Sequence, residues 1–216
     1  MVLGEGEVEI SARKFNVAIG AVLLWGFILN FLIVQLFTQQ LVDLVAKTSI
    51  WWVLGGYIVC VIIGWLLVRS RKALVSFIGY HFVAVPVGIV LAVSLQQVDT
   101  NMILQAIFMT ALVTLAMFIM ALLFPTFFLK MGRVIFFAVL LCIVCEVAAI
   151  LIFHHDPAIF DWIAALLLSL YIGYDWARAN KCKKTLNNAV DIATALYLDI
   201  INLFVRIIEI MQKSSD

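Results

Sequence analysis

Seven apolar stretches, each about as long as a membrane-crossing helix, follow one another along the chain. A helix needs about 20 mostly apolar residues to cross a bilayer. The stretches are Val17–Phe37, Ile50–Val68, Ala73–Leu95, Met102–Phe124, Val134–Phe153, Ile159–Trp176 and Ala189–Met211. They predict transmembrane helices, because the strands of a membrane β-barrel would instead show alternating segments of about ten residues.

Short polar connectors such as RSRK, QQVDTN and HHDP separate these stretches. Short links make consecutive helices antiparallel neighbours. We therefore expect an all-α, polytopic membrane protein in a single transmembrane domain, residues 1–216. A cytoplasmic segment at residues 1–14 and a tail at residues 212–216 would flank the helices.

The composition narrows the class of protein. Hydrophobic residues make up 66% of the chain and charged residues 12%, whereas ordinary globular domains carry about 25% charged residues. The net charge of +1 offers no basic surface for a nucleic acid. This composition excludes a soluble enzyme, a disordered chain and a nucleic-acid-binding protein. We expect the apolar surface of the protein to contact the lipid bilayer.

The distribution of Lys and Arg predicts the orientation. Eleven of these cations lie in the N-terminal segment and in the connectors after the second, fourth and sixth stretches, while the opposite side has only Lys47 and Lys213. Cytoplasmic loops are enriched in Lys and Arg. We expect a cytoplasmic N-terminus and, after seven crossings, a C-terminus outside.

Charged residues inside the stretches are confined to the last three. They include Glu146, Asp175, Asp191, Asp199, Arg206 and Glu209. Charges within a membrane are costly and commonly mark ion or proton pathways. In the last stretch Asp191, Asp199, Asn202, Arg206 and Glu209 cluster on one side of a helix. This stripe indicates a helix that is shielded by the others or lines a polar cavity, and a surface-lying amphipathic helix is the alternative.

Several of these polar residues have two interpretations. Asp175 is either functional or a boundary carboxylate paired with Arg178 three residues on. His81 is either a hydrogen-bonded packing residue or a proton relay. Glu146 either pairs with Arg206, for which Glu209 competes, or stays neutral and bonds to a backbone carbonyl.

The last two stretches contain recognisable motifs. The segments SLYIGYDWARA and ALYLDIINLFVRII resemble the signature of the Bax inhibitor-1 family in its bacterial branch. VRSRKAL is similar to the family's basic cluster, and FPTFFLKMGR is similar to a recurrent family segment. The resemblance covers the chain from about the second stretch onward.

This resemblance implies six helices in two layers around a central seventh, in a bacterial plasma membrane. It also implies a pH-sensitive calcium leak rather than an enzyme, with calcium and protons as partners and no cofactor. In the family an aspartate pair lies on the cytoplasmic side of the pore and is held by an Arg latch. The matching positions here are Asp175, Asp199 and Arg69, with Arg71 as a less favoured latch.

Two adjacent carboxyl groups affect each other's ionisation in any protein. Two carboxylates within about 3 Å cannot both ionise at low cost, so they share a proton. We hypothesise that protonation loosens the Arg69 contact and lets the second helix move. Calcium prefers several oxygen ligands, so Asp175 and Asp199 would form a transient binding point.

One departure from the family pattern concerns the second stretch. Bacterial relatives carry a Glu about three turns before the latch, whereas GGYIVCVIIGW contains no acid. Glu146 is a candidate substitute for it.

Three other functions remain as alternatives. A non-conducting membrane scaffold that modulates stress-response partners is the first of them. An intramembrane aspartyl protease would need a Gly-x-Gly-Asp motif, which Asp199 lacks. The third alternative is a seven-helix receptor or retinal protein, and a retinal pigment would need a Lys where the last stretch has Arg206. The sequence leaves ion selectivity, oligomeric state and protein partners open.

Overall fold

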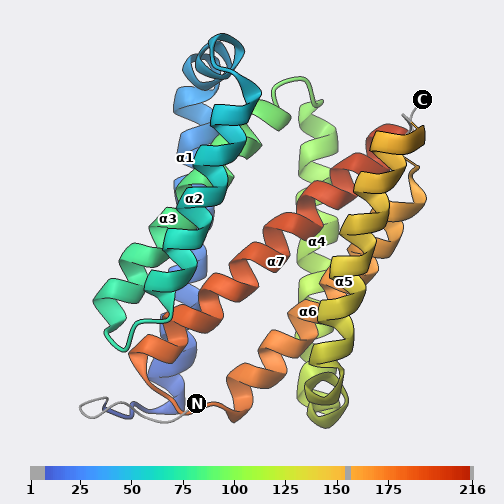
Figure 1. The fold of residues 1–216 in the computed structure, drawn as a ribbon. Coiled ribbons are helices and arrows are strands. Elements are labelled where there is room, and N and C mark those ends of the chain that lie inside the picture. The colour runs from blue at the N-terminus through green and yellow to red at the C-terminus, as the bar shows by residue number, and fades with distance from the viewer. Residues whose placement is uncertain (1–7, 154–156, 215–216) are drawn as a thin grey trace. The chain divides into compact units, whose positions relative to one another are not determined.

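The computed structural model describes residues 8–153 and 157–214, and these residues form helices and no strands. Figure 1 shows the helices in chain order. They are α1 (Ala12–Lys47), α2 (Ile50–Val68), α3 (Ala73–Ser94), α4 (Thr100–Leu123), α5 (Pro125–Phe153), α6 (Ile159–Lys181) and α7 (Leu186–Lys213). The prediction of an all-α protein is confirmed.

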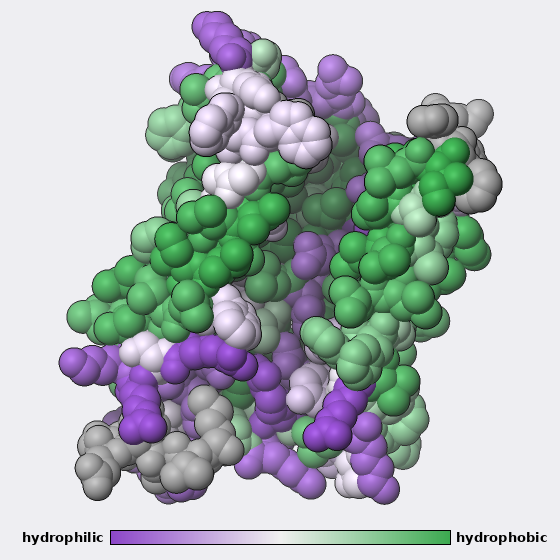
Figure 2. Space-filling view, viewed as in Figure 1, coloured by the Kyte–Doolittle hydropathy of each residue, from purple (hydrophilic) through white to green (hydrophobic). Residues whose placement is uncertain are grey.

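Six of these helices, α1 to α6, are long and apolar enough to cross a membrane. Figure 2 shows apolar side chains over much of the exposed surface of the helices, with hydrophilic ones gathered near helix ends. Large apolar residues that face outward, such as Leu115, Phe137 and Leu151, suit contact with lipid rather than water. The chain is thus a multi-pass membrane protein. A seventh crossing by α7, its central position and the orientation of the termini stay predictions.

Several helices extend beyond the predicted apolar stretches. The expected connector after Phe37 is helical as far as Lys47, because its Gln, Leu, Ala and Lys residues are good helix formers. Helix α5 begins at Pro125, since proline is favoured in the first turn. The flanking segments are shorter than expected, as α1 begins at Ala12 and α7 ends at Lys213. Most of the HHDP connector lies outside the described residues.

The chain divides into two compact units. Unit 1 comprises Met1–Val98 and Cys182–Ala195. In it α3 packs against both α1 and α2. At the α2–α3 contact the backbones approach so closely that a Cβ at Gly64 would lie 2.9 Å from the carbonyl oxygen of Gly79. Tyr80 of α3 is fully buried and donates a hydrogen bond to the carbonyl of Val22 in α1.

Unit 2 comprises Asp99–Lys181 and Leu196–Asp216. Helix α6 packs against α4 and α5, and Phe128, Ala121 and Ala177 form a buried apolar cluster there. The C-terminal part of α7 belongs to this unit as well. All the charged residues predicted inside the last three stretches, except Asp191, therefore lie in unit 2. The single membrane domain expected from the sequence stays a prediction.

Candidate functional site

The two aspartates singled out by the sequence both lie in unit 2. Asp175 is in the last part of α6 and is 2% exposed. Asp199 is in α7 and has Asp175 as its hydrogen-bonding and electrostatic neighbour. The structure therefore brings the two carboxyl groups together, and we call them the aspartate pair. Its role in pH sensing stays a prediction.

The aspartate pair lies beside a cation and includes one buried carboxylate oxygen without a hydrogen bond among the described residues. Arg178, three residues after Asp175 on α6, places Nη2 3.5 Å from Asp175 Oδ1. Asp199 is half-buried, and its Oδ2 atom is buried without a hydrogen-bond partner among the described residues. Most buried polar atoms are hydrogen-bonded. An unpartnered carboxylate oxygen beside a second carboxyl group is a place where a proton or a cation can bind.

Close helix packing positions Asp175. A Cβ at Gly173 would overlap the ring of Phe128 in α5, and a Cβ at Gly132 of α5 would overlap the ring of Tyr174. These contacts come from the two residues that directly precede Asp175. Each glycine therefore lets an aromatic ring fill the space between α5 and α6, which fixes the backbone that carries the carboxylate.

The proposed latch residues belong to unit 1. Arg69 follows the last residue of α2, and its guanidinium lies 3.9 Å from the centre of the Trp65 ring. This is the geometry of a cation–π contact. Arg71 is exposed in the turn that leads to α3. A latch function for either residue stays a prediction, and Arg178 is the arginine that contacts Asp175 within unit 2.

His81 in unit 1 is held in a defined hydrogen-bonding arrangement. Trp25 donates its indole N–H to His81 Nε2 at 2.9 Å, so Nε2 must be an acceptor. His81 Nδ1 lies 2.8 Å from the carbonyl oxygen of Phe77 and must therefore carry the proton. Both ring nitrogens are used by a neutral imidazole. This geometry favours the interpretation of His81 as a packing residue over that of a proton relay.

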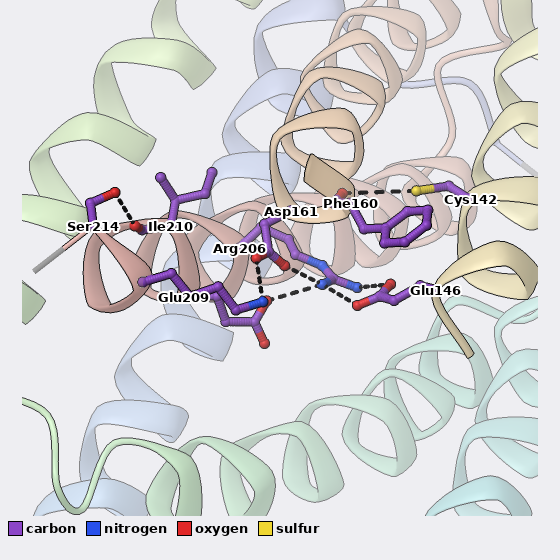
Figure 3. A network of polar contacts seen from close by, with 9 residues as sticks. Cys142, Glu146, Phe160, Asp161, Arg206, Glu209, Ile210 and Ser214 are labelled. Atoms are coloured by element: carbon purple, nitrogen blue, oxygen red, sulfur yellow. Dashed lines mark hydrogen bonds and ion pairs between the residues drawn. The ribbon is translucent and has the colours of Figure 1, made fainter. Parts of the chain in front are cut away.

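A second group of charges in unit 2 joins α5, α6 and α7 (Figure 3). Arg206 makes a two-pronged contact with Glu146, in which Nη1 donates to Oε1 at 2.6 Å and Nη2 to Oε2 at 2.7 Å. Nη1 also donates to Asp161 Oδ1 at 2.7 Å and to Glu209 Oε2 at 3.1 Å. Lys213 donates to Asp161 Oδ2 at 2.7 Å. We call these five residues the charge network.

Sequence reasoning found only part of the charge network. Glu146 pairs with Arg206, which is one of the two alternatives left open, and Glu209 shares the same guanidinium. Asp161 was missed, although its side chain is fully buried and receives both cations. In the sequence, Asp161 stands out only as an acidic residue in the first turn of a predicted membrane span. Asn202, the remaining polar residue of the predicted stripe, is exposed.

No group of three or more His, Cys, Asp and Glu side chains within residues 8–153 and 157–214 is arranged to hold a metal ion. In the charge network the carboxylates are already occupied by Arg206 and Lys213. The aspartate pair supplies two carboxylates, fewer than the six to eight oxygen ligands that calcium takes, and a transient calcium contact there stays a prediction.

Comparison with known proteins gives the family. The family described as "Inhibitor of apoptosis-promoting Bax1" matches residues 13–216. Uncharacterized proteins from two strains of Helicobacter pylori are 30% and 29% identical to this chain over 159 residues, which is 71% of the chain and 67% of each relative. The family match over residues 13–216 extends over both units and includes the aspartate pair. The chain is therefore a member of the Bax inhibitor-1 family of membrane proteins.

Proposed function

We propose that this protein is a pH-sensitive calcium leak of a bacterial plasma membrane, in which protonation of the aspartate pair controls passage of the ion. The observation that carries the proposal is the buried, unpartnered Oδ2 atom of Asp199 next to Asp175. Membership of the Bax inhibitor-1 family supports it.

The charges around the pair explain how a proton would act. When both carboxylates are ionised, Arg178 can offset one of the two negative charges. The remaining charge can attract a calcium ion or a further guanidinium, for which Arg69 is the candidate. A single proton shared by the two carboxylates removes that charge. The guanidinium is then released, and the leak increases as the pH falls.

The Trp65 contact gives Arg69 a second place to reside. A cation over an exposed tryptophan ring gains about 0.5–1 kcal/mol, which is too little to hold the arginine against an ionised carboxylate. Arg69 would therefore leave Trp65 when the pair is ionised and return when the pair is protonated. This exchange is the latch in physical terms.

Calcium efflux from liposomes that contain only this protein tests the proposal. We expect the wild-type leak to rise as the pH is lowered. Asp175→Asn and Asp199→Asn should move the pH dependence to lower pH, because the carboxylate that remains ionises without a neighbouring like charge. Asp43→Asn, which changes an exposed carboxylate on α1, is the matched control and should keep the wild-type profile.

The latch is tested in the same liposomes. Arg69→Ala should raise the leak at alkaline pH, where the ionised pair would otherwise hold the guanidinium, and Arg71→Ala should not. Wild-type liposomes that lose calcium no faster than protein-free ones would overturn the channel proposal and favour a non-conducting modulator. Aspartate variants with the wild-type pH profile would overturn the role of the pair.

A further inference from the structure

The charge network and the aspartate pair lie along the same faces of α6 and α7. Arg206 follows Asp199 by seven residues, which is 20° short of two full turns and about 10 Å along the helix axis. Asp161 precedes Asp175 by fourteen residues on α6, again within about 40° of whole turns. A rotation of α7 that moves one group therefore moves the other by nearly the same angle.

The geometry of the charge network resists such a rotation. The planar guanidinium of Arg206 and the carboxylate of Glu146 face each other through two parallel hydrogen bonds, an arrangement that fixes orientation as well as distance. Asp161 is held by Arg206 and also by Lys213, two turns further along α7. Helix α7 is thus attached at two levels to side chains from α5 and α6.

The hydrogen bond between Asp175 and Asp199 requires a proton on one of the two carboxyl groups. The carboxyl groups of Asp175 and Asp199 repel each other when both are ionised. A rotation of 30° about the axis moves an atom 5 Å from that axis by about 2.6 Å. A displacement of that size is enough to end a hydrogen-bonding contact. The rotation of α7 therefore decides whether Asp199 lies within reach of Asp175.

We propose that Arg206 and Glu146 are positioning residues for the aspartate pair, because their two-pronged contact fixes the rotation of α7 at which Asp199 meets Asp175. This inference rests on the proposed function for its physiological meaning. Its physical content is independent of transport, since it concerns the sharing of a proton.

Infrared titration of the protein in detergent or lipid tests the proposal. The absorption band of the protonated carboxyl group is assigned by its loss in Asp199→Asn, and its midpoint is followed with pH. When the two carboxylates no longer meet, each ionises independently and the band disappears at lower pH. We expect Glu146→Gln and Arg206→Gln to lower the midpoint by about one pH unit.

The two variants separate positioning from a simple effect of charge at a distance. Removing the positive charge of Arg206 would by itself make ionisation harder and raise the midpoint, whereas removing the negative charge of Glu146 would lower it. Positioning predicts that both variants lower it. Shifts in opposite directions, or no shift, would overturn the proposal.

Further variants serve as controls. Arg206→Lys keeps the charge but loses the planar fork, so it should shift the midpoint in the same direction by less. It also retains a cation should Arg206→Gln fail to fold. Asn202→Ala changes an exposed residue between the two groups and should leave the midpoint unchanged.

Calcium efflux from liposomes is measured separately from the infrared midpoint. Midpoints that shift together in a protein that does not release calcium would support positioning and overturn the channel. A wild-type protein that shows no band dependent on Asp199 would overturn positioning, whatever the liposomes show.

Discussion

The charge network and the aspartate pair, which lie at two ends of unit 2, differ in how their buried charges are compensated. The charge network matches three carboxylates with two cations through contacts of 2.6 to 3.1 Å. The aspartate pair has two carboxylates, one arginine at 3.5 Å and an unpartnered oxygen. Buried ions are stable when they are paired and hydrogen-bonded. The network meets that requirement, whereas one buried oxygen of Asp199 has no hydrogen-bond partner among the described residues. The pair is therefore the better candidate for a group that changes its charge.

Helix packing differs between the same two ends. Near the aspartate pair, α5 and α6 meet through glycine and aromatic contacts at Gly132, Gly173 and Phe128. Near the charge network they meet through Glu146 and Asp161, which share Arg206. Apolar contacts therefore hold the end where the charge is expected to change, so that a change in protonation there need not separate the two helices.

The largest effect is expected from breaking the charge network. Arg206→Met leaves Glu146 and the fully buried Asp161 without their shared cation. Loss of one partner from a buried ion pair costs about 3–5 kcal/mol, so the free energy of unfolding should fall by about that amount. Unfolding titrations in mixed micelles would measure it. Arg206→Lys should lose less, and an Arg206→Met protein as stable as wild type would contradict the view that the network stabilises unit 2.

The next effect concerns the glycine contacts near the aspartate pair. Gly173→Ala forces a methyl group against the Phe128 ring, and overpacking of this kind costs about 1–3 kcal/mol. Gly20→Ala on α1 is the matched control, because a Cβ there has no atom within 4 Å. Micelle unfolding should show a loss for the first variant only. Equal stability of both would mean that α5 and α6 can separate freely at this point.

Removing a carboxylate should change the free energy of unfolding differently at the two ends of unit 2. Asp199→Asn removes a like charge beside Asp175 and should leave the free energy of unfolding near pH 7 unchanged or raise it by about 1 kcal/mol. Asp161→Asn should lower it, because Arg206 and Lys213 would both lose an ionic partner. Unfolding titrations of the two variants side by side would test this, and a similar loss in both would remove the contrast.

The smallest effect is expected from Arg178. A nearby cation favours the ionised form of a carboxyl group, so Arg178→Gln should move the infrared midpoint of the aspartate pair to higher pH. The Arg178 side chain is 36% exposed, and solvent screening should keep the shift below about one pH unit. Lys181→Gln, an exposed cation on the next turn, should have no effect. A midpoint that falls in Arg178→Gln would reject this account of the pair.

The sequence alone predicted the helices and the two residues of the aspartate pair. Apolar stretches of membrane length indicate helices directly, and Asp175 and Asp199 stand out against an apolar background and within motifs that resemble a family. The Glu146–Arg206 contact could be anticipated only as one of two alternatives. The sequence indicates that the two residues lie at a similar depth in the membrane, but it does not indicate whether their helix faces point toward each other.

Other features could not be read from the sequence. Asp161 lies 45 residues before Arg206, and no local spacing connects them. The contacts of His81 with Trp25 and Phe77 depend on the packing of α3 against α1. The length of α1 was missed because glutamine and lysine interrupt an apolar stretch without interrupting a helix.

The extent of α1 also makes bilayer thickness a variable for this protein. Its 36 residues span about 54 Å at 1.5 Å per residue, whereas a whole bilayer with its headgroups measures about 40–45 Å. A straight helix of this length must tilt from the membrane normal or project into water at one end. In a thicker bilayer, made of lipids with longer acyl chains, α1 would tilt less from the membrane normal. Because α3 packs against α1, the tilt of α3 would change with it.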